Sequence, residues 1–133
     1  MMTVTISEEV ILPLHTDTVY QVLVDAEAHS KLCGSNVNIA AQPNADFIVG
    51  GDEPSIYGRI LELIPGKKIV LHWRLVSPEW PQNHFSTVSI ELEAKDDGTT
   101  LFLTHKDIPL ALKDAIQSGW NEYYWTPLRG LKS

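Results

Sequence analysis

The chain of 133 residues has the length of one ordinary domain, 1–133, and its 44% hydrophobic content excludes an intrinsically disordered chain. Acidic residues outnumber basic ones by 17 to 10, so the net charge of −7 disfavours nucleic acid and anionic membrane surfaces as partners. A single cysteine, Cys33, excludes an intrachain disulfide; with no visible signal peptide and no apolar run of membrane-spanning length, we expect a cytoplasmic protein.

The first predicted element is a strand. Apolar and polar residues alternate over residues 3–12, which is typical of a strand with one buried face. Glu8 is the exception, because it falls among the apolar positions. Pro13 follows directly and should end the strand, since proline cannot donate a backbone hydrogen bond.

Two short helices and two short strands are expected next. Asp25 can cap the second helix, and Gly34 can stop it. Residues 38–41 and 46–49 are candidate strands on either side of a turn-like segment. We therefore expect mostly short elements in this part of the chain, before the longer strands begin.

Two hairpins are predicted in the second half. Pro65-Gly66 suits the two central positions of a type II turn in the first hairpin, and Asp97-Gly98 suits the turn of the second. The strands of these hairpins are predicted at residues 56–64, 67–76, 87–93 and 99–106. Connections this short require antiparallel pairing.

From Pro109 to Leu131, apolar residues recur every three or four positions, which predicts a long amphipathic helix. Pro127 removes one backbone donor, so we expect a kink in the last turn. The helix face is rich in aromatic residues: Trp120, Tyr123, Tyr124 and Trp125. The whole order predicts an α+β fold, in which a curved antiparallel sheet of six to seven strands is covered by the terminal helix.

No motif in the chain indicates catalysis or metal binding. None of the five histidines lies three or four residues from another or at ligand spacing from Cys33, so we expect surface or rim histidines, no metal site and no cofactor. They are His15, His29, His72, His84 and His105. Nucleophile motifs are absent, and we interpret Cys33 as a small buried or half-buried thiol.

Three strings of the second half resemble the activator of heat-shock-protein-90 ATPase homologue-like family, of the C-terminal-domain type. They are residues 64–74 with Trp-Arg at the end, residues 80–88 with Trp-Pro at the start, and residues 119–128 on the final helix. The family belongs to the START and birch-pollen-allergen-like superfamily. The resemblance implies a helix-grip fold with a cavity between sheet and helix, and it supplies no shared catalytic residues. The chain departs from the family pattern at Leu32-Cys33 and in the loop 50–54, which border the expected cavity mouth.

The aromatic residues either fill the core or line a cavity. We predict the second arrangement, in a protein that binds a small, largely apolar ligand without catalysis. The candidate ligand-binding residues are Tyr57, Trp73, Trp120 and Tyr124, with His72 and Arg74 as polar contacts.

Two alternative functions remain open. The family resemblance favours a stress-response protein with a chaperone partner, which would regulate a heat-shock-protein-90-type ATPase. A cyclase-like enzyme would need an acid or base within the cavity, and His72, Glu62 or His105 are the candidates. The expected oligomeric state is a monomer or a weak homodimer.

Overall fold

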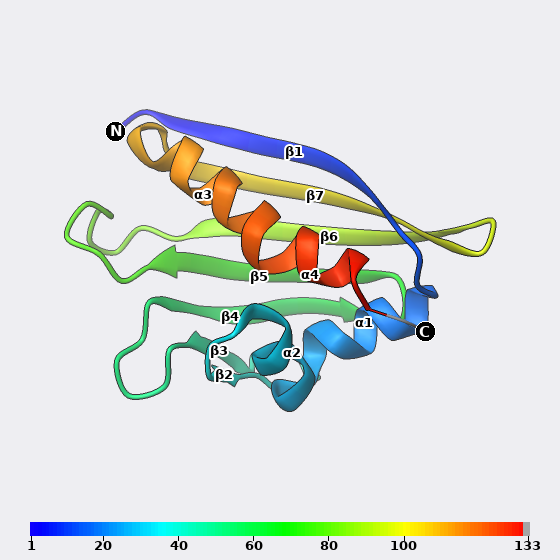
Figure 1. The fold of residues 1–133 in the computed structure, drawn as a ribbon. Helices are drawn as coiled ribbons and strands as arrows, with labels where there is room; N and C mark the ends of the chain where they lie inside the picture. The colour runs from blue at the N-terminus through cyan, green and yellow to red at the C-terminus, as the bar shows by residue number, and fades with distance from the viewer. Residues whose placement is uncertain (132–133) are drawn as a thin grey trace.

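In a computed structural model that describes residues 1–131, a seven-stranded antiparallel sheet curves around a C-terminal helix (Figure 1). This confirms the predicted helix-grip fold. Residues 132–133 of the predicted domain lie outside the described residues. No helix within residues 1–131 is long and apolar enough to cross a membrane.

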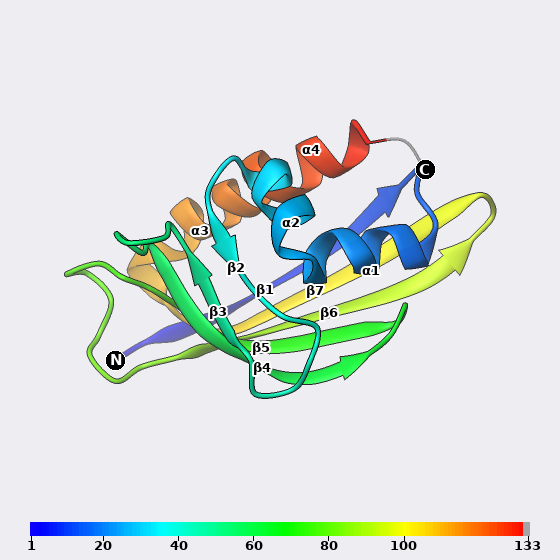
Figure 2. The ribbon, with the colours of Figure 1, turned by 90° about the horizontal axis from the view of Figure 1, so that it is seen from below.

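The strand order in the sheet is β1-β7-β6-β5-β4-β3-β2. The strands are β1 (Thr3–Leu12), β2 (Val37–Asn38), β3 (Asp46–Val49), β4 (Ile56–Ile64), β5 (Lys68–Leu75), β6 (Ser86–Lys95) and β7 (Gly98–Pro109). Two helices, α1 (Thr16–Val24) and α2 (Ala26–Cys33), follow β1. Figure 2 shows that they lie on the same side of the sheet as the C-terminal helix.

The predicted boundary of α2 is confirmed at both ends. Asp25 precedes the helix in an extended conformation, and its carboxylate accepts a hydrogen bond of 2.9 Å from the backbone N–H of Ala28. Gly34 ends the helix in the left-handed conformation, with φ 76°. The candidate strand at 38–41 is wrong in extent, because β2 begins one residue earlier and has only two residues.

The first hairpin turns as predicted. Gly66 has φ 72°, as the third position of a type II turn requires, and the N–H of Lys67 donates to the carbonyl of Ile64 at 2.9 Å. In the second hairpin the turn is shifted by one residue, because Lys95 pairs with Gly98 and the two aspartates before Gly98 form the loop. A Cβ on Gly98 would lie 2.3 Å from the carbonyl oxygen of Leu12, so this glycine serves the close approach of two strands.

The C-terminal helix begins later than predicted. Pro109 is the last residue of β7 and pairs with Thr3, because a residue without a backbone donor is tolerated at a strand end. The helix then consists of a 3₁₀ turn (Leu110–Leu112), α3 (Lys113–Trp120), a π-helical turn (Asn121–Trp125) and α4 (Thr126–Arg129).

The π-helical turn changes which aromatic residues face each other. The N–H of Thr126 donates to the carbonyl of Asn121, five residues earlier. Residues five apart are therefore neighbours, and the rings of Trp120 and Trp125 stack with centroids 5.4 Å apart and planes inclined by 12°. Pro127 follows one residue after this turn, and the wider turn accommodates a residue that cannot continue α-helical hydrogen bonding.

The structure explains why Glu8 interrupts the apolar positions of β1. It is half-buried on the inner face of β1, between the buried Ile6 and Val10, and its carboxylate accepts a hydrogen bond of 3.3 Å from the indole Nε1 of Trp125. Trp125 and Leu128 are 1% and 0% exposed, so the space around α4 is filled by side chains. A groove between helix and sheet lies instead toward α3.

Candidate functional site

A groove lies between α3 and strands β4 and β5, with a volume of about 180 Å³. A second hollow of about 270 Å³ extends it toward α2 and β3. The residues that line both are Ile56, Leu75, Tyr123 and Tyr124. The first is also lined by Trp73, Ala115, Ile116, Gly119 and Trp120, and the second by Cys33, Ser35, Val49 and Ser55. We call these two hollows together the aromatic groove.

Strand β5 places Trp73 in the groove because its neighbours in the sheet are small. Gly58 is its partner on β4 and Ser86 is its partner on β6. A Cβ on Gly58 would lie 1.9 Å from the carbonyl oxygen of His72, so only glycine fits there. The absent side chain at Gly58 and the small one at Ser86 leave the Trp73 indole above the sheet as one wall of the groove.

The Trp120 indole is held by a buried chain of hydrogen bonds. Its Nε1–H donates to Nδ1 of His105 at 3.1 Å, and Nε2 of His105 lies 2.7 Å from the hydroxyl of Ser86. The Ser86 hydroxyl donates in turn to the Trp73 carbonyl at 2.7 Å. Since Nδ1 accepts, the network assigns the proton to Nε2 in a neutral imidazole. Burial lowers the pKa of His105 to about 3, which keeps this ring neutral.

Tyr124 is held in a similar way by α2. Its hydroxyl lies 2.9 Å from Nε2 of His29, and Nδ1 of His29 donates to the carbonyl of Leu23 at 2.8 Å. The phenol is therefore the donor to Nε2. Burial lowers the pKa of His29 and raises the pKa of Tyr124, so both groups are neutral near pH 7.

These two networks define the chemistry of the groove. The polar ends of Trp120 and Tyr124 are already hydrogen-bonded to protein groups, so the rings present mainly their apolar faces. No ionisable carboxylate, lysine or arginine lines the groove among residues 1–131. The arrangement suits an uncharged, apolar guest.

Residues 14–131 match the family model of the activator of Hsp90 ATPase homolog 1-like proteins. The chain belongs to this family. It is 31% identical over 75 residues to the human activator of 90 kDa heat shock protein ATPase homolog 1; the match covers 56% of this chain and 22% of the human protein. The matched segment thus spans about a fifth of the length of that relative.

Two solved structures show the same fold in this Hsp90-activator-like family. An HSP90 activator from Plasmodium falciparum superposes with a TM-score of 0.78 at 25% identity, covering 93% of this chain and 91% of that chain. The Aha1 dimer from Colwellia psychrerythraea superposes with a TM-score of 0.74 at 16% identity, covering 95% and 96% of the two chains. The second likeness supports the fold only.

The six predicted ligand-binding residues lie in two separate groups. Trp73, Trp120 and Tyr124 line the aromatic groove. Three others do not line it: Tyr57, His72 and Arg74. Successive strand residues point to opposite faces, so Trp73 in the groove sends both of its neighbours outward.

The predicted exposure of the histidines is wrong for two of them. His29 and His105 are 4% and 0% exposed, contrary to the expectation of surface or rim positions. His105 lies two residues after Leu103 and four after Leu101, on the same face of β7, and this shared position could have predicted its burial. His29 lies three residues before Leu32 on the inner side of α2, at helical spacing.

None of the candidate acids and bases lines the aromatic groove. Glu62 is exposed and pairs with Lys68 at 3.8 Å. His72 lies on the outer face, where it stacks on Phe85. His105 is inside, but Trp120 occupies its only free lone pair. Within residues 1–131, no group of three or more His, Cys, Asp or Glu side chains could hold a metal ion.

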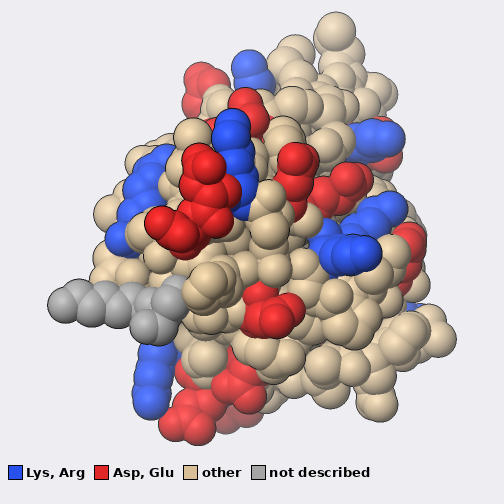
Figure 3. All heavy atoms as spheres, turned by 90° about the vertical axis from the view of Figure 1, so that its right-hand side faces the viewer, with Lys and Arg blue, Asp and Glu red and all other residues tan. Residues whose placement is uncertain are grey.

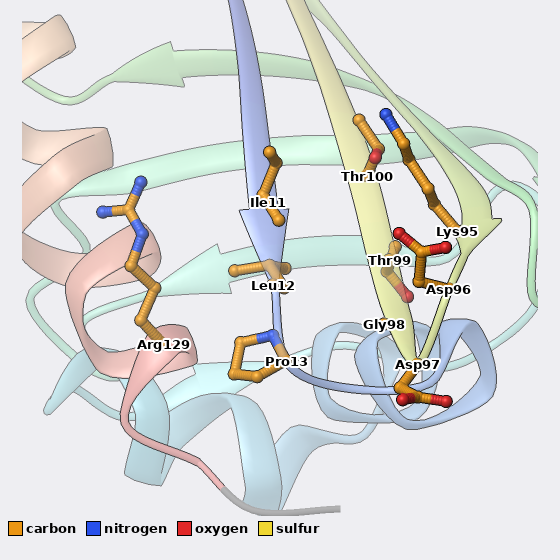
Figure 4. Close-up of a pocket in the computed structure, with 10 residues that line it drawn as sticks. All are labelled: Ile11, Leu12, Pro13, Lys95, Asp96, Asp97, Gly98, Thr99, Thr100 and Arg129. Carbon is orange, nitrogen blue, oxygen red and sulfur yellow. The ribbon is translucent and has the colours of Figure 1, made fainter.

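A larger hollow of about 710 Å³ lies at the far end of the molecule, beside the turn between β6 and β7 (Figure 4). Figure 4 shows Arg129 and Lys95 on opposite sides of β1, with Asp96 and Asp97 at the turn. Figure 3 shows basic and acidic side chains interspersed over this end. Because opposite charges neighbour each other there and none of the aromatic side chains lines it, we take the smaller aromatic groove as the candidate site.

Proposed function

We propose that the protein binds a small, largely apolar ligand in the aromatic groove and does not transform it. The supporting observation is that four aromatic rings meet at one groove while the polar ends of two of them are engaged elsewhere. These rings belong to Trp73, Trp120, Tyr123 and Tyr124. Aromatic walls without charged groups favour an uncharged ligand, because a buried charge would lose its hydration without gaining a partner.

The dimensions of the groove suggest an elongated ligand. The hollow at α3 has about 180 Å³ and is smaller than most small-molecule sites, which fall at roughly 300–1,000 Å³. A molecule that also enters the neighbouring hollow of about 270 Å³ would reach this range. Tyr123 lies between the two hollows and is 50% exposed, so its ring would cover the ligand from the solvent side.

Gly119 provides a direct test. It lines the groove from α3, and a Cβ there would meet only the Tyr123 ring at 3.9 Å. Gly119→Leu should therefore fill the groove without disturbing the helix, while Gly119→Ala leaves most of the volume free. Nile red, an uncharged apolar fluorophore, should bind the wild type and Gly119→Ala, and its affinity for Gly119→Leu should fall at least about tenfold. Equal binding by all three proteins, or none by the wild type, contradicts the proposal.

A second proposed function follows from family membership. Both the human relative and the Plasmodium falciparum structure are described as activators of the 90 kDa heat shock protein or its ATPase. In this alternative, the protein is a cytoplasmic stress-response regulator that docks on such a chaperone, as a monomer or a weak homodimer. The assay is the ATPase rate of the host chaperone with saturating protein, and an unchanged rate rejects this function while leaving ligand binding intact.

A further inference from the structure

We propose that the outer face of the sheet carries a second binding surface, which recognises an acidic peptide segment of a partner protein. The surface is formed by Tyr57, His72, Arg74 and Phe85, and we call it the Phe85 patch. The helices cover one face of the sheet (Figure 2), and Tyr57, His72 and Arg74 point to the other, because they alternate along their strands with Gly58 and the groove-lining Trp73. The proposal is independent of the ligand proposed for the groove.

Phe85 is the centre of this patch. The His72 imidazole stacks on its ring with centroids 5.6 Å apart and planes inclined by 27°. The Tyr57 ring lies 6.4 Å away, and Cζ of Arg74 lies 5.8 Å from the Phe85 ring centroid. Tyr57 and Arg74 are also directly paired in the β4–β5 ladder. Three side chains from two strands thus converge on one ring at the surface.

Residues before and after Phe85 in the sequence fix its position. In the preceding loop, Trp80 is 2% exposed, and its Nε1–H donates to the carbonyl of His84 at 2.7 Å. Nε2 of His84 donates to the carbonyl of Asp107 at 2.7 Å, which ties the loop to β7. Ser86, the next residue, is fully buried and bonded to β5. The patch is preorganised, so binding a partner costs little ordering of the protein.

The charges on this face favour an anionic partner. Arg74 takes part in none of the ion pairs formed among residues 1–131. A guanidinium above a ring keeps its N–H edge available for a carboxylate. Arg59 is paired with His72 in the ladder, and its contact with Asp46 is long, at 3.9 Å between two side chains that are each 56% exposed. Such an exposed pair is weak and open to exchange for a partner's carboxylate.

A peptide fits this surface better than a nucleic acid. Lys106, Thr87, His72 and Arg59 follow one another in register across four strands, so the two cations are separated by about 14 Å at the usual strand spacing. An extended peptide repeats side chains on one face every 6–7 Å or so and could place carboxylates near both. The overall charge of −7 would repel a polyphosphate at long range, whereas a few carboxylates can pair locally.

The test compares two octapeptides, (Glu-Ala)₄ and (Gln-Ala)₄, by backbone amide NMR of the full chain. We expect saturable shifts in β4, β5 and the start of β6 with (Glu-Ala)₄, at a Kd of about 1 mM or tighter, and no saturable shifts with (Gln-Ala)₄. Arg74→Ala should weaken binding about tenfold or more, and Arg74→Lys and Phe85→Leu should each weaken it about threefold or more. Arg129→Ala, which removes an exposed cation on α4, is the matched control and should bind as the wild type does.

Four results would overturn the proposal. They are equal shifts with both peptides, no saturation by either, equal loss in Arg74→Ala and Arg129→Ala, and tighter binding of an eight-residue oligothymidylate than of (Glu-Ala)₄. Shifts of the same amides on simple dilution would assign the patch to a second copy of this chain instead. Near-UV circular dichroism verifies folding, and Phe85→Leu and Arg74→Lys carry the test if Arg74→Ala does not fold.

Discussion

Replacing His105 by leucine tests the buried hydrogen-bond chain that holds Trp120 at the groove. Leucine has a similar volume but can neither accept from the Trp120 indole nor donate to Ser86. The indole N–H would remain buried without a partner, and an unsatisfied buried donor costs about 1–3 kcal/mol. We expect a loss of about 2 kcal/mol in the free energy of unfolding at pH 7, which lowers the Tm of a chain of this size by about 7 °C.

A double-mutant cycle separates this hydrogen bond from loss of packing. Trp120→Phe removes the donor and leaves Nδ1 of His105 without a partner. In the double variant, neither group remains unsatisfied. The two single costs should therefore exceed the cost of the double variant by about 1–2 kcal/mol, measured by urea unfolding at pH 7.

The pH dependence of stability gives an independent measurement. Burial lowers the pKa of His105 to about 3 in the folded protein, below its ordinary value near 6.5. As the pH falls below about 6.5, His105 becomes protonated in the unfolded chain but stays neutral in the folded protein. The free energy of unfolding therefore decreases toward acid pH, by up to about 1.4 kcal/mol per pH unit. The wild type should lose about 1.7 kcal/mol more than His105→Leu between pH 6.5 and 5, because the unfolded histidine is only half protonated at pH 6.5. Strictly additive single costs together with identical pH slopes would refute a neutral, hydrogen-bonded His105.

Three further substitutions have clear expected results. Tyr124→Phe should cost about 1–2 kcal/mol, because Nε2 of His29 loses its donor, while Nile red affinity stays within about twofold since the hydroxyl points away from the groove; a tenfold loss of affinity would contradict this orientation. Gly58→Ala should lower the free energy of unfolding by about 3 kcal/mol or prevent folding, because its Cβ would lie 1.9 Å from the His72 carbonyl oxygen, and a change below 1 kcal/mol or so in chemical unfolding would contradict it. Asp25→Ala should cost about 1 kcal/mol through loss of the α2 cap, whereas Asp25→Asn should cost much less in the same assay.

Local patterns predicted most of the fold. The structure confirms the strand at residues 3–12 and the turn at Pro65-Gly66. Both features depend only on residues that are close together in the sequence. Asp25 and Gly34 likewise bound α2 through contacts within a few residues. Such features can be predicted because strand alternation, turn conformation and helix capping are properties of short segments.

Local patterns did not predict how the terminal helix changes its geometry. The spacing of apolar residues indicated one long helix with a kink at Pro127, but it did not indicate the π-helical turn before Pro127 that brings Trp120 onto Trp125. The contact of Trp125 with Glu8 joins residues 117 positions apart. The spacing of residues within the helix carries no information about a contact with β1, so the sequence pattern could not predict it.

Composition and alternation by themselves determined an acidic α+β protein with an antiparallel sheet, a covering helix and a concentration of aromatic residues near the end of the chain. Only the tertiary structure decided which aromatic residues act together. A strand offers two faces, and the packing of α3 on one of them sends Trp73 into the groove and leaves His72 and Arg74 around Phe85 outside. That choice depends on long-range packing between helix and sheet, because alternation assigns residues to two faces without saying which face the helix covers.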